Sequence, residues 1–393
     1  MRDAVIVSAS RTPIGKFKGD LAGFTFPELA AIVLRDVIGK VGLEAETVDE
    51  VILGNLFAGD WGNVARASLL EAGFPLQVAG LTVDRQCSSG VNAVGLAASM
   101  IQTNMADVII AGGVESYSRQ PYYVERPRAA FPAGIKELKY KVAPARYVGG
   151  CLSSDMINTA ENLARQYQIT REECDCFAMD SHLKAAKAWE SGCFDEQVVE
   201  VRVPQRKGED KLIRMDACIR PETSMESLAK LRPIMEGGVV TAGNASPMND
   251  GAAVVLVMSA DKARELGLKP LAVVREYAAC GVEPTTMGIG PVFATRKLMQ
   301  RHGYTLEDFD LIELNEAFAA QSLACIRELG VDPKKVNVEG GAIAIGHPNG
   351  ASGGMLTARL VYALRRRNLK RGLVSFCIGG GQGFSLVLEN PDV

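Results

Sequence analysis

The sequence predicts an α/β fold made of two similar halves, with an insertion in the first half. Segments typical of buried strands alternate with segments of helical apolar spacing along most of the chain. Their order early in the chain returns near its end, which indicates an internal duplication. Between the two copies, prolines, aromatic and basic residues crowd residues 119–144. We therefore expect an N-terminal half at 1–118 with 244–265, an inserted loop domain at 119–243, and a C-terminal half at 266–393.

Composition places the chain among ordinary globular proteins and gives no sign of a polyanionic partner. Its 393 residues are many for one core, and 47% are hydrophobic and 23% charged. Basic residues number 43 and acidic residues 46, for a net charge of −3. This balance favours neither nucleic acid nor an acidic membrane surface as a partner.

The cysteines and the apolar runs bear on the cellular compartment. There are nine cysteines, an odd number at irregular spacings, and no secretory leader is visible. The apolar runs are too short to span a bilayer. The sequence therefore predicts a cytoplasmic protein with free thiols and no membrane association.

The first half contains several strands and helices in alternation. A threonine of the N-cap type, Thr25, and a proline two residues on start one of the helices. Expected strands are 4–9, 50–55, 80–83, 106–113 and 252–258, and expected helices are 25–41, 63–72 and 91–101.

The second half repeats this order. Residues 42–55 and 303–315 both run through an acidic turn into a buried strand that ends in asparagine. Each half later has a Gly/Ser-rich turn that opens a helix, at 87–90 and at 350–354. Further strands are expected at 271–277, 376–381 and 384–388. Loops that follow the strands of both halves are expected to meet in one crevice, where ligands usually bind.

The insertion is expected to carry helices at 156–167 and 171–191. Thr170 and Glu173 form the pattern of a capping box at the start of the second helix. Cys174 and Cys176 resemble half of a metal site, but no second cysteine pair at ligand spacing accompanies them. We interpret them as structural and expect no metal.

Cys87 is the first candidate for chemistry. It follows an expected strand and lies at or just before the start of the helix at 91–101. Free N–H groups and the helix dipole favour a thiolate at such a position. The alternative is a buried cysteine that serves as a small apolar residue.

The second half supplies possible partners for Cys87. Of the three histidines, His182 lies in a charged helix and His302 beside an arginine, so both are expected at the surface. His347 lies between glycine and proline before a helix start. Cys377 ends a strand and precedes several glycines, whose N–H groups can face a ligand oxygen. A strand follows these glycines, which excludes a dinucleotide fingerprint.

Seven motifs in the same order make the sequence resemble the thiolase family (acetyl-CoA C-acyltransferases) over essentially its whole length. They are 5–15 (VIVSASRTPIG), 84–90 (DRQCSSG), 111–116 (AGGVES), 241–246 (TAGNAS) with 249–252 (NDGA), 315–319 (NEAFA), 340–348 (GGAIAIGHP) and 377–381 (CIGGG). The resemblance implies the thiolase fold, with two doubled α/β halves in α-β-α-β-α layers and a loop domain that binds coenzyme A.

The resemblance also implies a reaction: reversible acyl transfer through a cysteine thioester, either thiolysis of a 3-ketoacyl-CoA or condensation of two acyl-CoA molecules. Cys87 matches the nucleophile, and a thiolate attacks and leaves well near neutral pH. His347 matches the base that deprotonates it. Cys377 matches the residue that exchanges a proton with the acyl α-carbon.

Two oxyanion holes follow from the same resemblance. One uses His347 with a water held by Asn315, and the other uses the N–H groups of Cys87 and Gly379. Ser246 and Arg220 match positions that contact the pantetheine and the adenine end of CoA. CoA and acyl-CoA are thus expected as substrates, with no permanently bound cofactor, and the family implies a homodimer or homotetramer.

The sequence departs from the family pattern near the acyl pocket. Acetoacetyl-CoA thiolases of the biosynthetic type have His-Met-Gly where this chain has Asp155-Met156-Ile157. Asn349 replaces an apolar residue, and Gly353-Gly354 replaces Gly-Ala-Arg. These departures leave the catalytic groups intact and predict a preference that is not restricted to acetoacetyl-CoA.

Two other functions are alternatives to a thiolase. A ketoacyl synthase or hydroxymethylglutaryl-CoA synthase of similar fold uses two histidines, or histidine and glutamate, beside its cysteine, and Cys377 argues against both. A non-catalytic CoA- or lipid-binding relative would have lost Cys87, His347 or Cys377, and the sequence retains all three.

Overall fold

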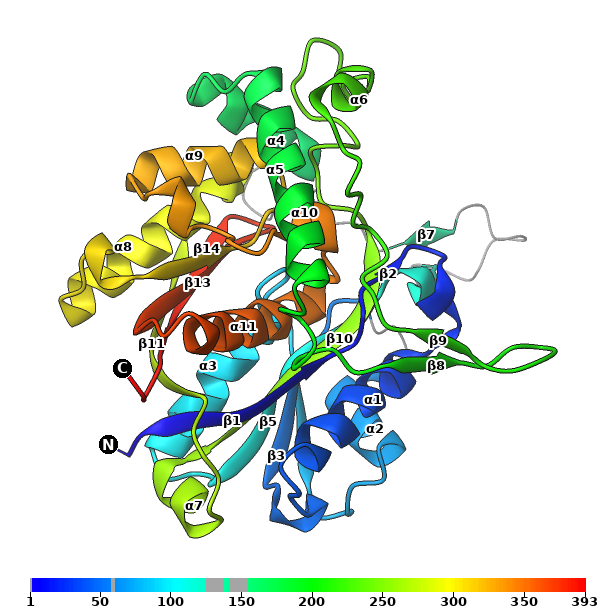
Figure 1. Cartoon of the computed structure of the whole chain (residues 1–393), viewed down its shortest axis with the longest axis vertical. Helices are drawn as coiled ribbons and strands as arrows, with labels where there is room; N and C mark the ends of the chain where they lie inside the picture. Colours follow the sequence, from blue (N-terminus) through cyan, green and yellow to red (C-terminus); the bar gives the residue numbers. More distant parts are fainter. Residues whose placement is uncertain (1, 58–60, 125–137, 141–154) are drawn as a thin grey trace, which may run out of the picture.

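The computed structural model describes residues 2–57, 61–124, 138–140 and 155–393. Its centre is a ten-stranded sheet in which nine strands follow one continuous path and β2 pairs with β10 at the side (Figure 1). In spatial order the path is β12 (Leu311–Leu314), β13 (Arg371–Ile378), β14 (Gln382–Glu389), β11 (Ala272–Gly281), β1 (Ala4–Arg11), β10 (Asn249–Ser259), β5 (Val108–Ser116), β3 (Glu50–Gly54) and β4 (Ala79–Val83), with β2 at Gly15–Lys16.

The strand order confirms the internal duplication. In the first half, the strands that follow β1 across the sheet are β10, β5, β3 and β4. In the second half, the strands that follow β11 are β14, β13 and β12. An isolated parallel bridge from Ile312 in β12 to Val336 takes the position that β4 has in the first half. The first strands of the two halves pair antiparallel, with Ala4 opposite Val274. This pairing joins the two halves into one sheet, and the sequence did not predict it.

Helices form the layers around these strands. Helix α3 (Ser89–Gln102) and helix α11 (Asn349–Arg366) pack against each other and against strands of both halves (Figure 1). The outer face of the first half is covered by α1 (Phe26–Gly39) and α2 (Val64–Glu71), and that of the second half by α8 (Gly290–His302) and α9 (Ala319–Leu329). Helix α7 (Ala260–Glu265) follows β10.

Alternation along the strands explains why these layers form. In β1, Ala4 and Ile6 belong to the core around α3 and α11, whereas Val5 and Val7 belong to the core under α1 and α2. Successive side chains of a strand point to opposite faces, so a strand that is apolar at every position requires cover on both sides. The sequence pattern of continuous apolar runs is therefore satisfied by helices on both faces.

The N-terminal ends of α3 and α11 approach each other closely. A Cβ atom at Gly353 would lie 1.9 Å from the backbone nitrogen of Val91, so only glycine fits there. This approach brings the segment before α3, which carries Cys87, next to the segment before α11, which carries His347.

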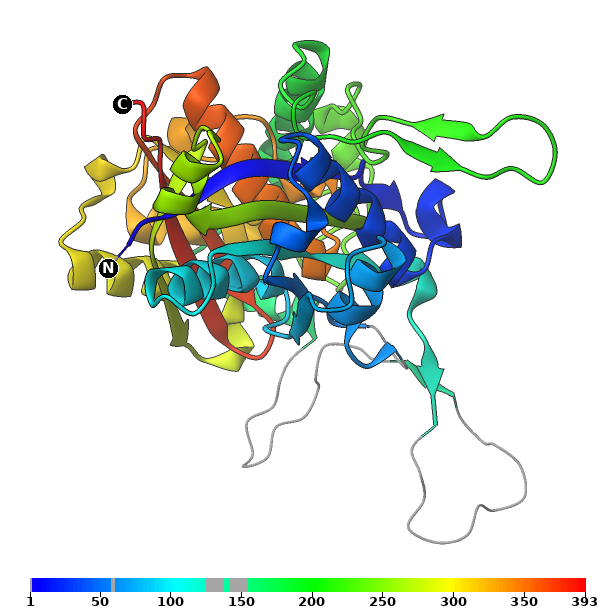
Figure 2. The same cartoon turned by 90° about the horizontal axis from the view of Figure 1, so that it is seen from below.

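The inserted region contributes helices on one side of this core. They are α4 (Met156–Gln166), α5 (Arg171–Glu190) and the short α6 (Met225–Ala229). Strands β8 (Val201–Val203) and β9 (Lys211–Ile213) form a hairpin that extends away from the core (Figure 2), and β6 (Tyr122–Tyr123) pairs with β7 (Lys139–Tyr140). Thr170 and Glu173 form the predicted capping box.

Most expected elements are present, with shifted ends. The strand expected at 106–113 is β5, which begins at Val108 and continues to Ser116, and the expected strand at 384–388 lies within β14. The thiolase resemblance also implies that a loop for tetramer contacts lies at 119–144, and much of this segment lies outside the described residues. The domain boundaries at 118, 243 and 265 stay predictions. None of the described helices is both long enough and apolar enough to cross a membrane.

Candidate active site

Cys87 lies in a tight turn between β4 and α3. The turn has Gln86 at a φ of 48°, and Ser88 is the N-cap of α3, so Cys87 directly precedes the helix as the sequence predicted. The backbone N–H of Arg85 donates to Ser89 Oγ at 2.8 Å, which holds the turn against the first residue of the helix.

The Cys87 thiol is uncharged at rest. Its sulfur accepts hydrogen bonds from the backbone N–H groups of Gly379 and of Cys87 itself, and both lower the pKa. Burial outweighs them, however, and together with the charges of Asp84 and Glu115 it raises the pKa of the thiol to about 11. The N–H groups thus favour a thiolate in the expected direction, but loss of solvent around the thiol has the larger effect on its pKa.

His347 is buried between two polar side chains. Its Nδ1 lies 2.6 Å from Ser352 Oγ, and its Nε2 lies 3.5 Å from the amide nitrogen Nδ2 of Asn315. The backbone N–H of His347 donates to Asn249 Oδ1 at 2.9 Å. Burial lowers the pKa of His347 to about 4, so the ring is neutral at pH 7.

Asn315, Cys377 and Gly379 lie at the carboxyl ends of two neighbouring parallel strands, β12 and β13. Asn315 comes directly after β12, and its N–H donates to Ser375 O in β13 at 2.9 Å. Cys377 is in β13 and fully buried, which raises the pKa of its thiol well above the ordinary value; the neighbouring Cys87 adds to this effect. Gly379 follows β13 and reaches the Cys87 sulfur. The structure thus groups Cys87 with Cys377 and Gly379, and it pairs His347 with Asn315, whose N–H bonds to the strand that carries Cys377.

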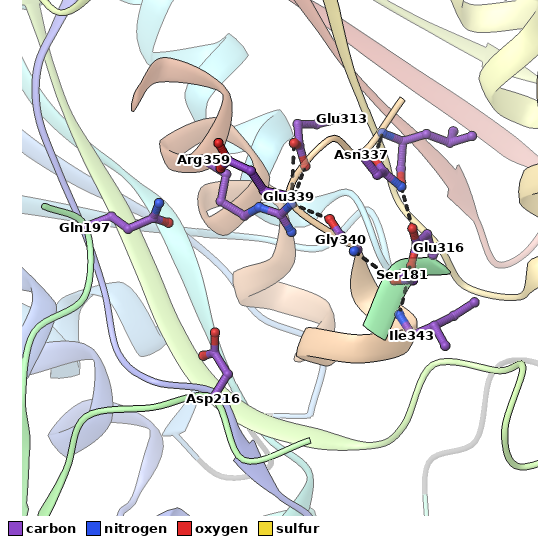
Figure 3. A network of polar contacts seen from close by, with 12 residues as sticks. Ser181, Gln197, Asp216, Glu313, Glu316, Asn337, Glu339, Gly340, Ile343 and Arg359 are labelled. Carbon is purple, nitrogen blue, oxygen red and sulfur yellow. Dashed lines mark hydrogen bonds and ion pairs between the residues drawn. The ribbon is translucent and has the colours of Figure 1, made fainter. Parts of the chain in front are cut away.

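A buried carboxylate supports this arrangement, and sequence reasoning did not single it out. Glu316, directly after Asn315, accepts from Ser181 Oγ at 2.7 Å, from Asn337 Nδ2 at 2.7 Å and from the N–H of Ile343 at 3.1 Å (Figure 3). Ser181 Oγ accepts in turn from the N–H of Gly341 at 2.9 Å. The signal in the sequence was an acidic residue next to the candidate asparagine.

These contacts hold the short helix α10 (Ala342–Ile345), which leads into His347. Because Ser181 lies on α5, the inserted region takes part in positioning the histidine loop. Glu316 therefore links the end of β12, the insertion and the start of α10.

Glu115 is a second buried carboxylate. It belongs to the motif at 111–116, but nothing in the sequence pointed to a role for it. It lies in β5 and accepts from the N–H of Gly350 at 3.1 Å, near the start of α11. It also accepts from the N–H groups of Leu56 and Phe57 and from Asn55 Nδ2 at 3.1 to 3.3 Å. A residue of the first half thus anchors the helix that follows His347.

The two predicted CoA contacts lie in other segments. Ser246 is half-buried, and its N–H donates to the carbonyl oxygen of Ala317 at 3.0 Å. Ala317 lies two residues after Asn315 in the sequence. Arg220 is exposed, and its backbone N–H donates to His182 Nδ1 at 3.2 Å. Among the described residues, neither side chain hydrogen-bonds to Cys87.

His182 is not at the surface, so that prediction is wrong, whereas His302 is exposed as expected. The side chain of His182 is only 4% exposed, because one face of the charged helix α5 packs against the segment around Arg220. Burial lowers the pKa of His182 to about 4, and the nearby charge of Arg220 acts in the same direction.

Metal-binding chemistry finds no support in the described part of the chain. No group of three or more His, Cys, Asp or Glu side chains there is placed to hold a metal ion. Cys174 is buried and Cys176 exposed, so the two side chains do not face one site.

Comparison with known proteins identifies the family. Models of the thiolase N-terminal domain and the thiolase C-terminal domain match residues 4–261 and 268–390. The chain therefore belongs to the thiolase family, and it is an acyltransferase with the thiolase fold. This confirms the resemblance seen in the sequence.

Three similar proteins illustrate the relationship. An acetyl-CoA acetyltransferase of Pseudomonas aeruginosa is 49% identical over 390 residues, with 99% of each chain covered. The crystal structure of the Bacillus anthracis acetyl-CoA acetyltransferase has a TM-score of 0.94 at 44% identity and covers 99% of both chains. A human mitochondrial 3-ketoacyl-CoA thiolase in complex with CoA has a TM-score of 0.92 at 38% identity, covering 99% of this chain and 98% of that one.

Proposed function

We propose that this thiolase carries the acyl group on Cys87 and that His347 and Cys377 move the protons. The observation that carries the proposal is a neutral, buried His347 beside Asn315, in the loop before α11, whose first turn contacts the first turn of the helix that follows Cys87. A neutral imidazole accepts a proton, and a thiol uncharged at rest must lose one before it attacks.

In the thiolysis direction, His347 Nε2 takes the proton of the Cys87 thiol, and the sulfur attacks the 3-keto carbon of the substrate. The bond between carbons 2 and 3 breaks, and Cys377 gives its proton to carbon 2 of the leaving acetyl-CoA. A second CoA thiol then returns a proton to Cys377 and attacks the thioester. The bond to the Cys87 sulfur breaks, and this sulfur takes its proton back from His347 Nε2. Condensation is the reverse sequence.

Charge develops on two oxygens during these steps. The N–H groups of Cys87 and Gly379 lie beside the Cys87 sulfur, so they are placed to donate to the carbonyl oxygen of an acyl group bound to it. His347 with Asn315 would stabilise the oxygen of the enolate. CoA is a substrate rather than a resident cofactor in this proposal, and Ser246 and Arg220 are proposed to contact it, consistent with the CoA-bound relative.

Replacing Cys87 with alanine tests the nucleophile. Wild-type protein mixed with acetyl-CoA is expected to gain one acetyl group by intact mass spectrometry, and Cys87→Ala protein none, because the thioester has no sulfur to form on. Cys193→Ala is the control, since the side chain of that half-buried cysteine hydrogen-bonds to nearby Ser191 at 3.3 Å and was not assigned to the site. Acetylation of the Cys87→Ala protein at another residue would contradict the assignment.

We further propose that the acyl preference extends beyond acetoacetyl-CoA. Asp155, where biosynthetic enzymes have histidine, accepts from the N–H of Asn158 at 2.9 Å and from its Nδ2 at 2.7 Å, and so caps α4. Thiolysis of C6 and C8 3-ketoacyl-CoA should therefore match or exceed that of acetoacetyl-CoA in kcat/KM. Cleavage of acetoacetyl-CoA alone would overturn this preference, and no turnover of any 3-ketoacyl-CoA would overturn the function.

We also infer that the chain forms a homodimer or homotetramer in the cytoplasm. Strand β4 forms one edge of the sheet in the described part of the chain. Leu81 in this strand is 36% exposed, and Leu76 just before it is 78% exposed. An unpaired strand edge with apolar side chains is a typical surface for association. Light scattering should give a mass of two or four times 42.0 kDa.

A further inference from the structure

His347 has a different hydrogen-bonding partner at each ring nitrogen. Ser352 Oγ lies 2.6 Å from Nδ1, and the Asn315 amide nitrogen lies 3.5 Å from Nε2. A neutral imidazole carries one proton, so one of these nitrogens donates and the other accepts. The identity of the protonated nitrogen decides whether His347 can act as a base at Nε2.

The Asn315 side suits an acceptor on the ring. The amide nitrogen Nδ2 faces Nε2 at 3.5 Å, the outer limit of a hydrogen bond, and in this orientation of the amide Nε2 presents its lone pair. The proton of His347 is then on Nδ1 and points at Ser352.

The contacts of Ser352 are consistent with a proton on Nδ1 of His347. Its hydroxyl group has one proton, and this proton has an acceptor in the carbonyl oxygen of Pro348 at 3.0 Å, one helical turn earlier. The hydroxyl oxygen is then left to accept the Nδ1–H of His347. Ser352 is fully buried, so no solvent competes for this contact.

We infer that Ser352 is a positioning residue that holds His347 in the Nδ1–H tautomer, with Nε2 free to take the proton of Cys87. The inference rests on the proposed function for its consequence, but the tautomer itself is a property of the resting enzyme. When the S–H bond of Cys87 breaks and Nε2–H forms, the Nδ1–H remains donated to Ser352. The same hydroxyl therefore supports both the neutral ring and the imidazolium.

His182 offers an internal reference. Its Nδ1 accepts the backbone N–H of Arg220, so its proton must be on Nε2. The two buried histidines of the chain are thus expected to be opposite tautomers. With three histidines in total, their ring nitrogens can be resolved individually.

The direct test is a long-range ¹⁵N–¹H correlation spectrum of wild-type protein labelled with ¹⁵N-histidine at pH 7.5. His347→Asn protein identifies the signals of His347 by their loss. The expected result is a protonated Nδ1 in His347 and a protonated Nε2 in His182. A protonated Nε2 in wild-type His347 would overturn the inference.

Ser352→Ala tests the role of the hydroxyl, and Thr357→Val is its matched control. Thr357 is also buried in α11, and its hydroxyl also donates to the carbonyl oxygen one turn earlier, that of Gly353 at 2.7 Å, without touching the histidine. In Ser352→Ala protein we expect the His347 proton to move toward Nε2. We expect kcat to fall by roughly 10- to 100-fold, with KM for CoA within about twofold.

Thermal melting separates this effect from a folding defect. Thr357→Val should lower the melting temperature about as much as Ser352→Ala while kcat stays within about twofold of wild type. Equal losses of kcat in both variants, or an unchanged tautomer in Ser352→Ala, would overturn the positioning role. Failure of the wild-type enzyme to acylate Cys87 would instead overturn the proposed function and leave the tautomer result standing.

Discussion

At the scale of single residues, burial decides the charge of the reacting groups. The start of α3 and two backbone N–H groups favour a thiolate at Cys87, yet the pKa of the thiol is raised to about 11. The pKa of His347 is lowered to about 4 by the same cause. Both groups are therefore neutral at pH 7, and a reaction must begin with proton transfer between them rather than with a preformed ion pair.

The buried His182 predicts a measurable dependence of stability on pH. Its pKa is about 4 in the folded chain and about 6.5 when unfolded, so the unfolded chain binds the proton more readily. The stabilising contribution is full above pH 6.5 and is lost as the pH falls toward 4. Between pH 8 and pH 5 this loss amounts to about 2 kcal/mol.

His182→Asn protein should escape that loss, because an asparagine Oδ1 can accept the Arg220 N–H without titrating. Urea unfolding at pH 8 and pH 5 should show the variant gaining about 2 kcal/mol relative to wild type. Other groups also titrate in this range, such as Glu313, whose pKa burial raises to about 7. They titrate in both proteins, so their contributions cancel in the difference between the two free energies of unfolding. Parallel pH curves for the two proteins would contradict the prediction.

At the scale of elements, α10 and the loop that follows it depend on close contact with Glu316 (Figure 3). A Cβ atom at Gly341, the N-cap of α10, would lie 2.0 Å from the carboxyl carbon of Glu316. The carboxylate cannot move away freely, because three donors hold it. The position of His347 is thus set by a carboxylate that follows β12, far from it in the sequence.

Gly341→Ala should therefore reduce both stability and activity. Overpacking of this kind costs about 1–3 kcal/mol, and the displaced loop should lower kcat at least about tenfold. Gly39→Ala in α1 is the control, since a Cβ atom there meets nothing within 4 Å. Urea unfolding and a thiolysis assay provide the measurements. Wild-type kcat in Gly341→Ala protein would show that the Glu316 contact does not position His347.

At the scale of the whole molecule, a buried ion pair ties the inserted region to the first half. Arg11 and Asp216 are both fully buried, with Nη1 and Oδ1 2.7 Å apart. Asp216 also accepts from the N–H of Ile14 at 2.8 Å and from Trp189 Nε1 at 3.1 Å. Removing one partner leaves a charge uncompensated in the interior.

Asp216→Ala is expected to lower the free energy of unfolding by about 3–5 kcal/mol, measured by urea unfolding at pH 7. Asp20→Ala is the matched control, because the pair of Lys211 with Asp20, at 2.7 Å, also joins the inserted region to the first half but is about half exposed. Its loss should cost at most about 1 kcal/mol. If both variants lost a similar free energy of unfolding, burial would not make the Arg11–Asp216 pair more important for stability than the exposed pair.

The sequence by itself determined the alternation of strands and helices, the duplication, the capped helices and the identity of the motif residues. Apolar runs, N-cap threonines and glycine-rich turns act locally, so their consequences can be derived residue by residue. The same local signals placed Cys87 before a helix and Cys377 at a strand end.

Only the tertiary structure decided how these pieces meet and which charges they carry. The pairing of β1 with β11, the burial of His182 and the contacts of Glu316, Glu115 and Ser352 join residues far apart in the chain or on different faces of a turn. Desolvation depends on everything that surrounds a group, so the raised pKa of the Cys87 thiol could not follow from its neighbours in sequence.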